Sequence, residues 1–227
     1  VGAGGARMTR YDSRASVLEA RTASRVRTLA LAGVAGPVLF TVLVILQGLL
    51  IPAYSHVSLP ISALEAWPTG WIQRLNFWLA ASLNIAFVYG LHLAVQPARR
   101  GATGVPLLVV GGIGLALAGL FPWVMVNGVP TETPLHVVGA ITTFAATGLG
   151  WLMFSRRMSA DGRWRGVSRY TMATGIAMLV LFIALGFFAI DDGTPLHPWA
   201  GLLQRILCVV WFTLLIVLAV RLRGVAR

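Results

Sequence analysis

Two segments far apart in the chain carry the same Gly-x-x-Gln-Arg pattern inside a largely apolar stretch. The first contains Gln73 and Arg74, and the second contains Gln204 and Arg205. A guanidinium group can bind a phosphate or carboxylate through two hydrogen bonds at once. Because an arginine in apolar surroundings is costly unless it has a partner, each should hold an anion or a loop carboxylate. The repeated pattern therefore predicts either anion binding or a structural ion pair.

The tetrapeptide Thr-Pro-Leu-His also occurs twice, and its histidines are His136 and His197. Histidine can transfer protons near neutral pH, and it can also bind a metal ion. The neighbouring segments hold carboxylates that acid–base chemistry would need, at Glu132, Asp191 and Asp192. If the protein is an enzyme, these three acids and two histidines are its candidate catalytic residues.

A zinc site is an alternative use of the histidines. His56, His136, His197 and Asp192 could hold Zn²⁺ with an open position for water, as catalytic zinc sites do. However, the chain has no His-x-x-x-His pattern, and the three histidines lie in separate segments. The single cysteine, Cys208, excludes an internal disulfide and a cysteine-based zinc site. We therefore predict no cofactor, with zinc as the less favoured alternative.

The composition shows whether these residues lie in water or in a lipid bilayer. Of 227 residues, 57% are hydrophobic and only 11% are charged, and the mean hydropathy is +0.81. A soluble domain has roughly a quarter of its residues charged. The chain therefore belongs in a lipid bilayer.

Six apolar stretches are each about long enough to cross a bilayer, which takes about 20 residues. They cover approximately residues 28–51, 71–95, 105–126, 135–155, 170–190 and 200–222. The connections between them are too short to form a soluble domain. We predict an all-α bundle of six transmembrane helices as one domain over residues 26–227, preceded by a disordered, arginine-rich cytoplasmic tail over residues 1–25.

The distribution of arginine predicts the orientation. All 18 basic residues are arginine, against 7 acidic residues, for a net charge of +11. Sixteen of them lie before residue 28, at 99–100, at 156–169 or after residue 220. These segments share one side of a six-span bundle, so the positive-inside rule predicts cytoplasmic termini and a multi-pass protein of the cell membrane. The basic excess then indicates contact with anionic lipids at the cytoplasmic face and not nucleic-acid binding.

The two remaining arginines, Arg74 and Arg205, lie near the opposite, outer side, and the repeats that contain them suggest three helical hairpins of common design. Polar residues gather on this side as well. The predicted ligand-binding set is Arg74, Arg205, His136, His197, Gln73, Gln204, Ser55, Ser62 and Glu65. We expect an outer polar cavity that binds or positions a lipid or lipid-like anion.

Three other interpretations stay open. The arginines could be purely structural, with Glu65 the nearest acid to Arg74 and Asp191 or Asp192 the nearest to Arg205. The protein could be a membrane enzyme, a metal-dependent hydrolase or cyclase, that acts on a lipidic substrate. It could also be a small transporter, which is the least favoured because few polar residues besides Gln47 and Asn84 fall in the middle of a span.

Several short motifs resemble those of a bacterial integral-membrane family, domain-of-unknown-function family 998. They are Pro52-x-Tyr54-Ser55, Ile61-Ser62-x-Leu64, Leu120-Phe121-Pro122 and His136. The resemblance covers roughly residues 29–222 and implies about six spans, with functional residues at Ser55, Ser62, Pro122 and His136. The family often has an aspartate shortly after Phe-Pro, where this chain continues Trp123-Val124-Met125-Val126. If an activity of the family needs that aspartate, either Glu132 replaces it here or the activity is lost. The family has no established chemistry that the resemblance could imply for this chain.

Overall fold

The computed structural model describes residues 3–95, 104–190 and 193–225, and most of them are helical. The six α-helices are α1 (Ala3–Leu49), α2 (Gly70–Ala94), α3 (Val105–Leu120), α4 (Pro134–Ala160), α5 (Arg165–Phe188) and α6 (Ala200–Val225). Two short 3-10 helices, η1 (Ile61–Ala66) and η2 (His197–Trp199), lie in the connections. The predicted all-α class is confirmed, with one exception: a small hairpin of strands β1 (Val124–Val126) and β2 (Val129–Thr131).

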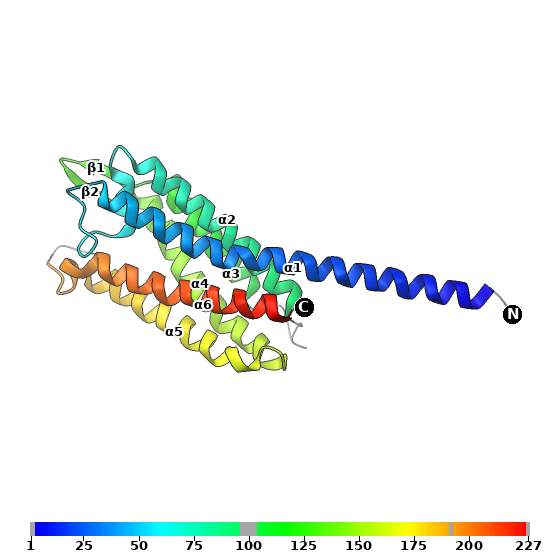
Figure 1. The fold of residues 1–227 in the computed structure, drawn as a ribbon. Coiled ribbons are helices and arrows are strands. Elements are labelled where there is room, and N and C mark those ends of the chain that lie inside the picture. The colour runs from blue at the N-terminus through cyan, green and yellow to red at the C-terminus, as the bar shows by residue number, and fades with distance from the viewer. Residues whose placement is uncertain (1–2, 96–103, 191–192, 226–227) are drawn as a thin grey trace.

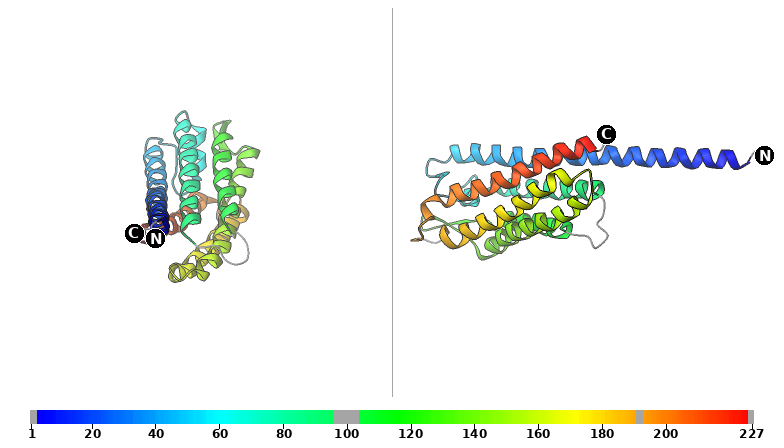
Figure 2. Two further views of the ribbon diagram at one scale, coloured as in Figure 1. Left: turned by 90° about the vertical axis from the view of Figure 1, so that its right-hand side faces the viewer. Right: turned by 90° about the horizontal axis from the view of Figure 1, so that it is seen from below.

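Each helix packs against the next one along the chain, and α6 returns to pack against α1 and closes the bundle (Figures 1 and 2). Five helices are long and apolar enough to cross a membrane, and they correspond to α1 from Ala20, α2, α4, α5 and the segment that contains η2 and α6. The chain therefore has the character of a multi-pass membrane protein.

Helix α3 is shorter than the sequence predicts. An apolar stretch extends to residue 126, but the helix ends at Leu120 after 16 residues. Pro122 follows two residues after Leu120 and cannot continue the helical hydrogen bonds. The apolar residues beyond it form the β1–β2 hairpin, whose turn at Asn127 and Gly128 has φ values of 50° and 82°. Asn-Gly suits a two-residue hairpin turn because both residues tolerate positive φ.

Helices α3 and α4 approach each other closely through glycine. A Cβ atom added to Gly114 would lie 2.7 Å from the backbone nitrogen of Thr143, and one added to Gly139 would lie 2.7 Å from that of Ala118. Such distances leave no room for any side chain. The two backbones therefore pack almost directly on each other, as small residues allow in membrane helices.

Helix α1 extends far beyond the bundle at its N-terminal end (Figure 1). The sequence predicts disorder for residues 1–25, whereas α1 begins at Ala3. The segment is rich in alanine and arginine, which favour helix, and contains no proline to end it. The helix of the first span therefore continues outward through this segment.

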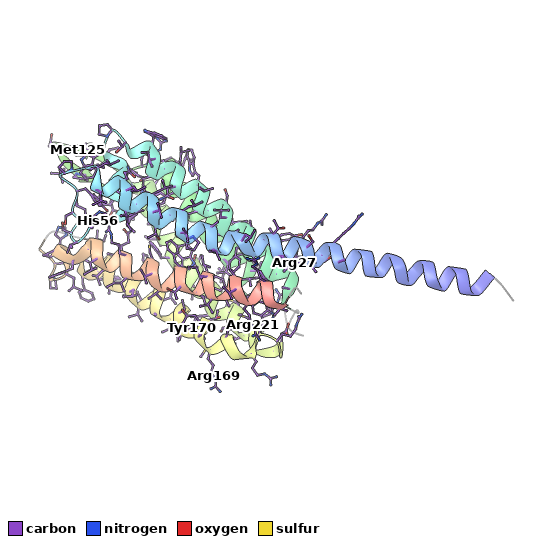
Figure 3. All side chains as sticks on the ribbon, in the orientation of Figure 1. Arg27, His56, Met125, Arg169, Tyr170 and Arg221 are labelled. Atoms are coloured by element: carbon purple, nitrogen blue, oxygen red, sulfur yellow. The ribbon has the colours of Figure 1, made fainter. Side chains whose placement is uncertain are left out.

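The two ends of the bundle differ in character. Arg27, Arg169 and Arg221 lie at one end, here called the arginine-rich end, and His56 and Met125 lie at the other, here called the hairpin end (Figure 3). The start of the bundle part of α1 and the last turns of α6 both lie at the arginine-rich end (Figure 1). Three of the arginines used to predict the orientation, Arg99, Arg100 and Arg227, lie outside the described residues.

Candidate functional site at the hairpin end

The site is built around Glu65, which the connection between α1 and α2 carries into the bundle. Residues Ile61 to Glu65 of η1 are all buried, and the Glu65 side chain has 0% exposure. Its Oε2 atom accepts a hydrogen bond of 3.3 Å from the backbone N–H of Trp123. The same atom lies 3.3 Å from Nδ1 of His136, in the first turn of α4. Glu65 thus joins the first connection of the chain to the α3–α4 hairpin.

Backbone carbonyls fix the orientation of His136. Its Nδ1 atom lies 3.0 Å from the carbonyl oxygen of Ala118 and 3.1 Å from that of Phe121, where α3 ends. A carbonyl oxygen can only accept, so Nδ1 must carry the proton. Thr133 adds hydrogen bonds from its hydroxyl to the carbonyls of Phe121 and Pro122. The start of α4 therefore satisfies the carbonyls left free at the end of α3, and Nε2 of His136 remains the proton-accepting atom of a neutral ring.

Burial raises the pKa of Glu65 from 4.5 to about 8, against the opposing effects of the hydrogen bond from Trp123 and the positive charge of Arg74. At neutral pH Glu65 is therefore mainly a neutral carboxyl group. Its second oxygen, Oε1, is buried without a hydrogen-bond partner among the described residues. A buried carboxyl group that can change its charge near neutral pH is typical of functional sites, although structural groups also behave in this way.

Amide side chains hold the η1 segment against α1 and α2. Gln47 donates to the carbonyls of Leu64 (3.3 Å) and Thr69 (2.9 Å). Asn76 donates to the carbonyl of Phe40 on α1 (3.2 Å) and to Oε1 of Gln73 (3.3 Å). These hydrogen bonds connect η1, α1 and α2, so all three elements together fix the position of Glu65. Asn76 is not among the site residues predicted from the sequence, although its spacing of three residues from Gln73 places both on one face of α2.

Two adjoining cavities lie beside His136. An inner cavity of about 50 Å³ lies among α1, α2, α3, α4 and α6, and it is mainly apolar. An outer cavity of about 210 Å³ lies among η1, α4, α5 and α6. The residues that line both are Ser62, His136, Ala140, Phe144 and Gln204. Polar groups of the first connection, α4 and α6 therefore meet on the wall that the two cavities share.

Arg205 holds the connection that precedes η1. Its Nη1 atom donates to the carbonyls of Leu59 (3.2 Å) and Gly201 (2.9 Å). Its Nη2 atom donates to the hydroxyl of Tyr54 (2.6 Å) and to Nδ1 of His56 (3.0 Å). Burial and the charge of Arg205 both lower the pKa of His56, so this histidine is neutral.

Arg74 makes different contacts despite its matching local sequence. It donates from Nε to the carbonyl of Gly119 at 3.2 Å and lies 5.9 Å from the ring centroid of Trp78. Neither Arg74 nor Arg205 lines the inner or the outer cavity. The structure therefore does not bring the two arginines and His136 together around one of these cavities. Gln204 of the predicted set does face both cavities, and its Oε1 accepts a hydrogen bond from the backbone N–H of Ile61.

The remaining predicted residues are dispersed. Nδ1 of His197 lies 3.2 Å from the carbonyl of Ala189, Ser55 accepts hydrogen bonds from the backbone of its own loop, and Glu132 lines the outer cavity. No group of three or more metal-binding side chains occurs within residues 20–95, 104–190 and 193–225. Asp191 and Asp192, which complete the predicted catalytic and metal sets, lie outside the described residues.

These features define a helical membrane protein with a buried carboxyl–histidine pair beside two cavities between the helices. A family model described as "protein of unknown function (DUF998)" matches residues 34–221, and the chain belongs to this family. No curated protein matches the chain. No solved structure matches it either. The family description names no activity, so any function has to be argued from the site itself.

The pKa of Glu65 predicts a stability that falls as pH rises. Between the unfolded value of 4.5 and the folded value of about 8, the folded state holds a proton that the unfolded state has lost, so the free energy of unfolding decreases with pH. We expect a lower Tm at about pH 9 than at about pH 6 for the detergent-solubilised protein. Glu65→Gln cannot ionise and should flatten this dependence, whereas an unchanged slope in Glu65→Gln would contradict the assignment.

The contacts of Arg205 predict which backbone it stabilises. Arg205→Gln removes donors to Tyr54, His56 and Leu59, and a hydrogen bond from a charged group contributes about 1.5–3 kcal/mol. Amide hydrogen exchange in residues 51–60 should therefore become about tenfold faster or more. Arg74→Gln is the matched control. Arg74 donates to the end of α3, so its substitution should leave the exchange rates of residues 51–60 unchanged. Equal effects of the two substitutions on this loop would show that the assignment is wrong.

Proposed function

We propose that the protein binds an amphipathic, lipid-like ligand at the hairpin end. The apolar part of the ligand would occupy the cavities, and its polar group would lie at their shared wall. The observation that carries this proposal is the convergence of Ser62, His136 and Gln204 on two adjoining cavities that are otherwise mainly apolar. A ligand site of this kind combines an apolar lining with a few polar groups that fix orientation.

The charges around the cavities favour a neutral polar head over an anion. No arginine is among the residues that line either cavity, and Glu132 lines the outer one. His136 presents Nε2 as an acceptor because backbone carbonyls hold the proton on Nδ1. A hydroxyl or amide head group could donate to this atom and accept from Ser62. In this proposal Arg74 and Arg205 position the loops and do not bind the ligand.

The membrane arrangement that we propose has six spans and cytoplasmic termini in the cell membrane. Five helices have spanning length, and α3, with 16 apolar residues, is about 24 Å long at 1.5 Å per residue. That length falls short of a core of about 30 Å, but α3 lies between α2 and α4 as a member of the bundle. The arginine-rich end would be cytoplasmic by the positive-inside rule, which places the site near the outer leaflet.

The contacts of the two Thr-Pro-Leu-His motifs support an origin in repeated hairpins. Nδ1 of His136 contacts the carbonyls at the end of α3, and Nδ1 of His197 contacts the carbonyls of Ala189 (3.2 Å) and Ile190 (3.3 Å) at the end of α5. Each histidine thus closes the preceding helix of its hairpin. The Gln-Arg pairs share less, because Arg74 and Arg205 bond to different parts of the chain.

An enzyme that performs acid–base chemistry on the bound ligand is the second candidate. The observation that favours it is the Glu65–His136 pair, in which a carboxyl group lies 3.3 Å from Nδ1. Such a pair can orient the ring and adjust the basicity of Nε2, which could then activate Ser62 or a water molecule for ester hydrolysis. This candidate replaces Glu132 with Glu65 as the partner of the catalytic histidine.

A cavity-filling substitution tests ligand binding. Ala140→Leu adds bulk to a residue that lines both cavities, and overfilling a packed site costs about 1–3 kcal/mol. Monoolein, with one chain and a neutral head, should raise the Tm of the purified protein. Ala140→Leu should weaken its binding about tenfold, as measured by native mass spectrometry. Ala145→Leu, on the same helix and outside both cavities, is the control.

Oleate, which has the same chain and an anionic head, should bind less tightly than monoolein. Binding of monoolein that Ala140→Leu and Ala145→Leu leave equally intact would contradict the proposed site. Preference for oleate would instead indicate that Arg74 and Arg205 bind the ligand.

The same purified protein can be assayed to decide whether it is an enzyme or only a binding protein. If the protein hydrolyses an ester, incubation with monoolein should release oleate, detected by mass spectrometry. Glu65→Gln preserves a hydrogen-bond acceptor for Trp123 and His136, so it should retain monoolein binding and lose the hydrolysis. If oleate is released at the same rate by wild type and Glu65→Gln, the acid–base role of Glu65 is wrong.

A further inference from the structure

A second site lies at the arginine-rich end, far from the cavities. The last turns of α4 and the first turns of α5 enclose a groove of about 570 Å³. The residues that matter for its chemistry are Arg156, Ser159, Arg165, Gly166, Arg169 and Met172. None of them belongs to the candidate site at the hairpin end. No arginine lines the cavities there, whereas three arginines line this groove.

The groove gathers positive charge without a carboxylate in its lining. Arg165 and Arg169 are four residues apart and therefore lie on one face of α5, and Arg156 faces them from α4. All three arginines are exposed. The acid in the adjacent turn, Asp161, pairs with Arg163 at 2.8 Å and does not line the groove. Three guanidinium groups thus face a hollow with no anion of the described chain to neutralise them there.

The turn between the two helices is held rigidly, so the groove has a defined shape. The carbonyl of Asp161 accepts hydrogen bonds from the backbone N–H groups of Trp164 (2.9 Å) and Arg165 (3.1 Å). The side chain of Trp164 is fully buried at 0% exposure. Gly166, in the first turn of α5, has open space where a Cβ would lie. A ligand can therefore approach the positive end of the α5 dipole as well as the arginines.

We propose that this groove binds the phosphate group of an anionic membrane lipid. Guanidinium groups bind phosphate through paired hydrogen bonds, and basic pockets between helices at the cytoplasmic side are a known form of lipid head-group site. Met172 extends the groove along α5, about 10 Å from Arg165 at 1.5 Å per residue, and is 44% exposed. An acyl chain leaving the head group along α5 would cover this apolar side chain. A soluble phosphate shares the head-group chemistry but would leave Met172 uncovered.

Native mass spectrometry of the full chain in detergent tests the site, with dioleoylphosphatidylglycerol as the probe and dioleoylphosphatidylcholine as the uncharged comparison. Each arginine near an anionic surface contributes about 1 kcal/mol, so Arg165→Gln and Arg169→Gln should each weaken phosphatidylglycerol binding about fivefold. Arg223→Gln, which removes an exposed arginine of α6 at the same end, is the matched control and should bind as wild type does. The lipid-free Tm should be the same in all three variants.

A parallel arm replaces the lipid with inorganic phosphate, at constant ionic strength, and measures Tm. A stabilisation by phosphate that Arg165→Gln abolishes, without selective lipid binding, would assign the groove to a soluble phosphate compound. Binding of both probes that depends no more on Arg165 and Arg169 than on Arg223 would overturn the proposal. Ala140→Leu should leave phosphatidylglycerol binding unchanged, so the outcome is independent of the site at the hairpin end.

Discussion

The bond between Nδ1 of His136 and the carbonyls that end α3 is the interaction on which the hairpin end depends. A helix that stops inside apolar surroundings leaves carbonyl groups that water cannot reach, and each would cost several kcal/mol. Pro122 forces α3 to stop early, and the first turn of α4 supplies the donors. Once Nδ1 is committed in this way, Glu65 can pack against the ring, and Nε2 is left as the atom available for chemistry.

The same requirement explains why the two arginines near the hairpin end, Arg74 and Arg205, make different contacts. Each lies close to the apolar core and must find acceptors, and backbone carbonyls supply them. Arg74 donates to Gly119 near the end of α3, whereas Arg205 donates to Leu59 in the first connection and to Gly201 in the first turn of its own helix. The local sequence fixes the depth of each arginine, whereas the neighbouring connection decides what it binds. Matching sequence patterns therefore need not give matching sites.

Hydropathy is sufficient to predict the all-helical class and nearly all of the helices, because the residues of each span set it locally. The end of α3 is harder to predict, because its apolar stretch continues into the β1–β2 hairpin and only Pro122 indicates where the helix stops. The pairing of Glu65 with His136 was not predicted. The two residues are brought together by the folding back of η1, and no periodic pattern in the sequence encodes that contact. Gln204 was predicted, but for its proximity to Arg205 and not for its place on the cavity wall.

The position of Glu65 also limits what the site can do. A carboxyl group that is neutral at physiological pH cannot neutralise an imidazolium ion, so a charged His136 would remain uncompensated in apolar surroundings. The pair is therefore stable with both members neutral, which suits the recognition of an uncharged polar head. A His136 ring protonated at Nε2 would be stabilised only by an ionised Glu65, because the neutral carboxyl group carries no compensating charge. Binding and acid–base chemistry thus depend on different states of one carboxyl group, and removing its charge while keeping its shape distinguishes them.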